Sequence, residues 1–227
     1  MNFYAELLAA TERERAELLA IPFIQDGAAG RLTRADYVAF LSQAYYHVRH
    51  TLPLLMACGA RLSARLEWLR SAMSEYIREE TGHEEWILND IRACGTDPEL
   101  IRNGAPALPA ELLVAYAYDV IARINPVGFL GMVLVLEGTS TAVATQAERA
   151  LQTSLGLPAA AFTYLSSHGE LDISHTRLFA SLVSRLDNPE DQATLIHCAR
   201  VFYRLYGDVF RDLDAHRQAQ RSQEIAA

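Results

Sequence analysis

The run VGFLGMVLVLE, from Val127 to Glu137, decides the fold class of this 227-residue chain. Its first ten residues are apolar on every face, and Asn125-Pro126 interrupts any helix that arrives from upstream. Such a run is well short of the about 20 apolar residues needed to cross a bilayer. We therefore expect a buried core helix from Pro126 to about Ser154, and no part of the chain in a membrane.

Helical patterns dominate on both sides of this run. Ala, Leu, Arg and Glu are abundant, and the glycines and prolines lie mostly between periodic segments. We expect a first helix over Phe3–Ala20, a loop from there to Gly30, a helix opened by a capping box at Thr33, and a long helix from Ser63 to about Cys94. The whole chain, residues 1–227, is predicted to form one all-α domain of about seven to eight helices, with a polar tail from about residue 218.

The composition excludes several function classes. All 20 basic residues are arginine, so neither a lysine Schiff base, as pyridoxal phosphate needs, nor a P-loop lysine is available. The net charge of -8, with scattered arginines, gives no footprint for nucleic acid. The N-terminal residues carry mixed charges and lack the basic and apolar regions of a signal peptide. The three cysteines have no CxxC spacing, as is typical of core thiols in a reducing compartment, so a cytoplasmic protein is expected.

Glu80 and His83 carry the first chemical signal. They lie three residues apart in the expected helix, which is the Glu-x-x-His spacing of carboxylate-bridged di-metal sites. Glu79 and Glu75 lie four and eight residues before His83 and could supply the same carboxylate. On its own, this pattern is also typical of a solvated helix face.

Glu137 is a second signal, because it ends the apolar run. Burying a carboxylate without a counter-charge costs several kcal/mol, so we expect Glu137 to be protonated, paired with Arg123 or Arg149, or bound to a cation. The third signal is the run HGELDISH, which places His168, Asp172 and His175 on one helix face.

Three carboxylates and three imidazoles suit two metal ions better than a structural zinc site, which takes four ligands and often includes cysteine. Two Fe(II) ions bring four positive charges against the three negative charges of Glu80, Glu137 and Asp172, so the site would be nearly neutral. Mixed imidazole and carboxylate ligation favours iron, with manganese as the usual competitor.

Together these residues resemble the haem-oxygenase-like non-haem di-iron oxidases and oxygenases, whose fold is similar to that of the TenA and PqqC proteins. In that family one core helix gives Glu and His, a second gives a lone Glu, and a third gives a His-x3-Asp-x2-His run. The matching residues here are Glu80 (or Glu79 or Glu75), His83, Glu137, His168, Asp172 and His175. The resemblance implies two iron ions, or manganese in their place, and oxidation of a small amino-acid-like or fatty-acid-like substrate by dioxygen.

Haem is not expected, because the first histidine, His47, falls on the second expected helix, whereas haem oxygenases place theirs on the first. The thiaminase activity of TenA proteins is not expected either, since the helix from Pro126 to Ser154 has no cysteine for the nucleophile. The rival is a metal-free TenA- or PqqC-like protein, either a cofactorless oxidase or a small-molecule-binding or regulatory protein.

A substrate pocket is expected close to the metal ligands. Its candidate residues are Tyr46, His47, His50, Gly131 and Arg177. The expected partners are the small-molecule substrate and dioxygen, with no nucleic acid and no membrane, and a homodimer is left open.

Overall fold

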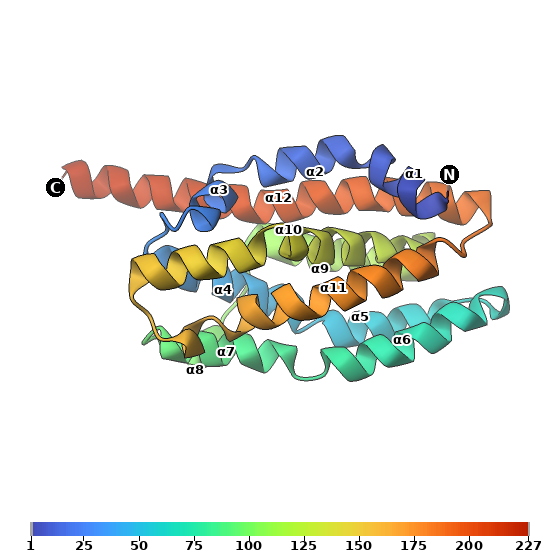
Figure 1. Ribbon diagram of the computed structural model, residues 1–227, viewed down its shortest axis with the longest axis horizontal. Helices are drawn as coiled ribbons and strands as arrows, with labels where there is room; N and C mark the ends of the chain where they lie inside the picture. The colour runs from blue at the N-terminus through green and yellow to red at the C-terminus, as the bar shows by residue number, and fades with distance from the viewer. Residues whose placement is uncertain (1, 227) are drawn as a thin grey trace.

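The computed structural model describes the backbone of residues 2–226, together with their side chains except those of residues 168–175 and 224–226. The described chain is an all-α bundle in which α12 runs along the full length of the molecule (Figure 1). The α-helices are α1 (Phe3–Ala10), α2 (Glu12–Leu19), α3 (Pro22–Ala28), α4 (Arg34–Val48), α5 (Thr51–Arg61), α6 (Glu67–Glu80), α7 (His83–Ala93), α8 (Pro98–Arg102), α9 (Leu108–Asp119), α10 (Leu130–Leu155), α11 (Thr163–Val183) and α12 (Pro189–Ala226). Short 3-10 or π segments are η1 (Ala64–Leu66), η2 (Val120–Ile124), η3 (Pro126–Phe129) and η4 (Ala159–Ala161).

The apolar run of the sequence forms η3 and the first part of α10, as expected of a core helix. Helix α10 packs against α11, α12 and α3. By length and composition alone, Pro126–Leu155 could cross a membrane, but 56% of its most apolar window is buried inside the protein. Such burial is typical of the central helix of a folded bundle.

The chain has more helices than the seven or eight predicted, because short breaks divide the long periodic segments. Thr11 separates α1 from α2, and its hydroxyl donates to the Leu7 carbonyl oxygen at 2.8 Å. The loop expected before Gly30 contains α3, which begins at Pro22, where the missing N–H costs nothing. The polar tail expected from about residue 218 is helical, since it continues α12 to Ala226.

Local signals predicted two of the helix ends. The capping box at the start of α4 is present: the Thr33 hydroxyl accepts from the Asp36 N–H at 3.1 Å, and the Asp36 carboxylate accepts from the Thr33 N–H at 2.8 Å. Gly95 follows α7 with φ of +83°, the left-handed conformation that glycine adopts most easily.

Asp90 on α7 fixes the start of α11. Its side chain is fully buried, and it accepts from the backbone N–H groups of Thr163 at 3.0 Å and Tyr164 at 2.8 Å, as well as from the Thr163 hydroxyl. The first N–H groups of a helix have no partner within the helix, so this carboxylate caps α11 from a different element. The helix that carries the HGELDISH run is thereby tied to the helix that begins at His83.

Candidate metal centre

Glu80 and His83 meet at a break between two helices. Glu80 is the last residue of α6 and His83 is the first of α7, so the continuous helix predicted over Ser63–Cys94 is wrong. Gly82 adopts φ of +92°, which turns the chain between the two helices. The predicted neighbours nevertheless lie together, with His83 Nδ1 2.9 Å from Glu80 Oε2, and their side chains are only 4% and 12% exposed.

Glu137 of α10 approaches the same place from another helix. The Tyr76 hydroxyl, on α6, donates a hydrogen bond to the Glu137 carboxylate. Burial raises the pKa of Tyr76, and the negative charges of Glu137, Glu80 and Glu79 raise it further. The carboxylates of two distant segments therefore act on one buried hydroxyl.

These carboxylates face a common cavity of about 750 Å³, its mouth included. Glu80 and Glu137 lie on its wall with His47, Tyr76 and Tyr206, and the other described lining residues are mostly apolar. No arginine is found among the described lining residues. Two carboxylates on a largely apolar wall favour a cation.

The two alternative first carboxylates are more exposed than Glu80. Glu75 is exposed and forms an ion pair with Arg78 on the surface of α6. Glu79 is also exposed. Arg123, a predicted partner for Glu137, pairs instead with Asp119.

The third predicted ligand group, His168, Asp172 and His175, lies outside the described side chains. The backbone of α11 packs against both α10 and α7, the helices of Glu137 and His83. Among the side chains that are described, no three His, Cys, Asp or Glu residues form a group that could hold a metal.

Of the five residues predicted to line a substrate pocket, His47 lies on the wall of this cavity. Its Nδ1 is 3.0 Å from the Gln43 carbonyl oxygen, and its ring contacts Tyr206 edge to face. The other four are not among the described residues that line this cavity. Nδ1 of His50 is 3.2 Å from the Tyr118 hydroxyl, and the Tyr46 hydroxyl lies against Gly104. Gly131 packs against the backbone of Ala199 on α12, and Arg177 is exposed.

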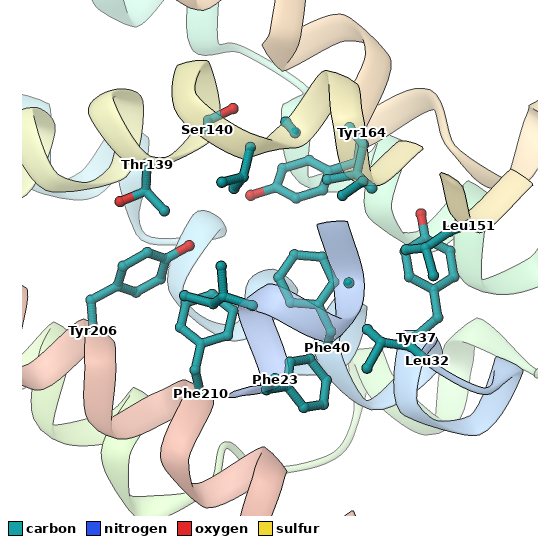
Figure 2. A pocket seen from close by; sticks show the side chains of 16 residues that line it. Phe23, Leu32, Tyr37, Phe40, Thr139, Ser140, Leu151, Tyr164, Tyr206 and Phe210 are labelled. Atoms are coloured by element: carbon teal, nitrogen blue, oxygen red, sulfur yellow. The ribbon is translucent and has the colours of Figure 1, made fainter. Parts of the chain in front are cut away.

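A second cavity, which the sequence did not indicate, adjoins the first. It has a volume of about 640 Å³, its mouth included, and lies between α3, α4, α10, α11 and α12 (Figure 2). Ser140, Tyr164 and Tyr206 line both cavities. The described lining residues of this second cavity include no charged side chain. Because its walls come from five helices, no local sequence pattern could have revealed it.

Comparison with known proteins places these features in a family context. A family model described as "Iron-containing redox enzyme" matches residues 38–207. No curated protein matches the chain.

Among solved structures, a domain of unknown function with a heme oxygenase-like fold from Shewanella denitrificans has a TM-score of 0.86 at 23% identity, covering 96% of this chain and 94% of its own. A TenA homologue from Pseudomonas syringae has a TM-score of 0.78 at 11% identity, covering 93% and 92%. Heme oxygenase-1 from Synechocystis, solved in complex with heme, has a TM-score of 0.76 at 10% identity, covering 99% and 98%. These likenesses establish the haem-oxygenase-like fold.

Proposed function

Because this chain belongs to the iron-containing redox enzyme family, we propose that its bundle holds two non-haem iron ions and oxidises a small molecule with dioxygen. The observation that carries the proposal is the convergence of Glu80, paired with His83, and Glu137 on one cavity. The remaining ligands would be His168, Asp172 and His175 of α11, the helix that packs against the helices of His83 and Glu137. Manganese is the alternative metal.

The donor set fits iron. Carboxylate oxygens together with imidazole nitrogens are ligands that iron prefers. Magnesium and calcium prefer sites made of oxygen atoms alone, and structural zinc sites often include thiolates. The three cysteines are buried elsewhere in the bundle, and burial raises the pKa of the Cys58 thiol to about 12, which disfavours the thiolate. Iron bound here would supply the one-electron chemistry that amino-acid side chains lack.

The chain's own residues would hold the ligands in place. The hydrogen bond from Tyr76 fixes the orientation of the Glu137 carboxylate, and such supporting contacts tune metal affinity. The Trp86 ring stacks on His83 with centroids 4.0 Å apart and planes at 25°, which restrains the imidazole. Apolar side chains on the cavity wall, among them Leu55, Phe129 and Met132, limit the access of water.

Metal analysis tests the proposal. After anaerobic loading with Fe(II) and removal of unbound metal, we expect about two iron ions per chain, as in other carboxylate-bridged centres. Glu80→Ala and His83→Ala should each lose at least one ion. Glu75→Ala is the matched control, because Glu75 is exposed and paired with Arg78, and it should load like the unmodified protein.

The same metal analysis distinguishes the proposed di-iron enzyme from a metal-free protein of the same fold. A folded protein that takes up neither iron nor manganese would support a metal-free TenA- or PqqC-like role in its place. Equal loss of iron in Glu75→Ala and Glu80→Ala would contradict the assignment of the first carboxylate.

A further inference from the structure

We propose that the second cavity binds an uncharged, extended hydrocarbon chain of the substrate, while the substrate's polar end lies in the cavity of Glu80 and Glu137. This inference rests on the proposed function and narrows the substrate class. It favours a molecule with a long apolar chain over an amino acid with a polar or charged side chain.

The first observation is that the two cavities share part of their walls. Ser140 of α10, Tyr164 of α11 and Tyr206 of α12 line both cavities, so the two cavities meet at these three side chains. The hydroxyl groups of these three residues are the polar atoms where the two cavities meet. The rest of the second cavity is lined mainly by hydrocarbon and aromatic side chains.

The second observation is the shape of the cavity. The residues that α10 contributes recur along one face of the helix, from Ser140 through Val143, Ala144 and Ala147 to Leu151. Ser140 and Leu151 are eleven residues apart, which corresponds to roughly 16 Å along a helix that rises 1.5 Å per residue. In Figure 2, Tyr206 and Thr139 lie toward one end of the cavity, and Leu151, Tyr37 and Leu32 lie toward the other. An elongated cavity of this kind suits a chain better than a compact group.

The third observation is the chemistry of the wall. The Phe210 ring lies 4.9 Å from Tyr206, 6.0 Å from Phe40 and 6.2 Å from Phe23, measured between centroids. These rings form a continuous aromatic surface facing α10 (Figure 2). A charged group placed there would lose its hydration, with no described lining residue of opposite charge to replace it.

Binding of straight-chain alcohols of increasing length to the metal-free protein tests the inference by calorimetry. Each buried methylene should lower the dissociation constant about fourfold, until the chain fills the cavity and further methylenes no longer increase the affinity. Ala147→Phe narrows the cavity and should weaken the long alcohols most. Ala142→Phe is the matched control, since it is the same substitution on α10 but faces a different cavity beside α1, and it should leave the series unchanged.

A third variant keeps the inference testable if Ala147→Phe does not fold. Val143→Ala enlarges the same wall, so it should shift the length limit toward longer alcohols. Affinity that does not change with chain length, equal losses in Ala147→Phe and Ala142→Phe, or free amino acids that bind more tightly than the longest alcohol would overturn the inference.

The iron measurement is independent of this test. A protein that loads iron but shows no chain-length dependence would refute the chain-binding site alone. A protein that shows the chain-length dependence but takes up no metal would refute the proposed function and leave the binding site standing.

Discussion

Replacing Asp90 with alanine is expected to destabilise the protein by about 3 kcal/mol, because this one carboxylate caps α11 from α7. The substitution removes the acceptor of two buried backbone N–H groups, those of Thr163 and Tyr164, and of the Thr163 hydroxyl. Each buried donor left without a partner costs roughly 1–3 kcal/mol. Relief from burying the Asp90 carboxylate offsets part of that sum, which gives the estimate of about 3 kcal/mol.

Urea and thermal unfolding measure the effect. For a chain of this length, about 3 kcal/mol corresponds to a fall in Tm of roughly 6–12 °C. Asp97→Ala is the control, because Asp97 also caps a helix, but it accepts only the Glu99 N–H at 3.0 Å in an exposed setting. That variant should lose about 1 kcal/mol. If Asp90→Ala loses no more stability than Asp97→Ala, the cap does not hold α11 as described.

Three further predictions concern other parts of the fold. Gly138→Ala should stabilise the protein by about 1 kcal/mol in urea unfolding, since an added Cβ meets nothing within 4 Å. Gly131→Ala should destabilise it by about 1–3 kcal/mol, because its Cβ would lie 2.7 Å from the Ala199 backbone nitrogen. The opposite order of stability would contradict the packing of α10 on α12. Arg217→Met should cost about 2 kcal/mol in the same assay. It removes the nearly buried guanidinium from Asp214, which keeps only a hydrogen bond from Gln218, and from Asp26, which keeps its ion pair with Arg31; a loss below about 1 kcal/mol would argue against this buried ion pair. Burial raises the pKa of Asp90 to about 6, outweighing its hydrogen bonds, so the native state binds a proton more readily than the unfolded state. The contribution of Asp90 to stability therefore falls as the pH rises from about 4 to 6. The Tm of Asp90→Asn should lack this fall across the same pH range, and a pH dependence equal to that of the unmodified protein would refute the assignment.

Features encoded within one helical turn could be predicted from the sequence. The capping box of Thr33 and Asp36 depends on residues three apart, and the left-handed Gly95 follows directly from the helix that it ends. Both depend only on neighbouring backbone groups, so the residue types alone indicate them.

The break between α6 and α7 shows the limit of such reasoning. The Glu-x-x-His spacing of Glu80 and His83 predicted neighbours on one continuous helix, but they are neighbours across a turn made by Gly82. A single glycine is compatible with a helix interior, and only the packing of the rest of the chain selects its positive φ. The sequence therefore indicated that Glu80 and His83 lie close together, but through the wrong local geometry.

Long-range features could not be predicted at all. Asp90 lies 73 residues before Thr163, and nothing near Asp90 in the sequence indicates that it caps a distant helix. Gly131 was compatible with either a substrate or a second helix close to its backbone, and the structure places α12 there, which the sequence near Gly131 does not indicate. In both cases the partner comes from another helix, and the sequence pattern contains only one of the two surfaces.

A crystal structure of the iron-loaded protein, with an anomalous-scattering map recorded at the iron absorption edge, tests the central claim most directly. We predict anomalous peaks in the cavity between Glu80, His83 and Glu137, on the side that faces α11. Iron bound only at the protein surface, or no peak in the cavity with these three side chains directed away from one another, would contradict the account.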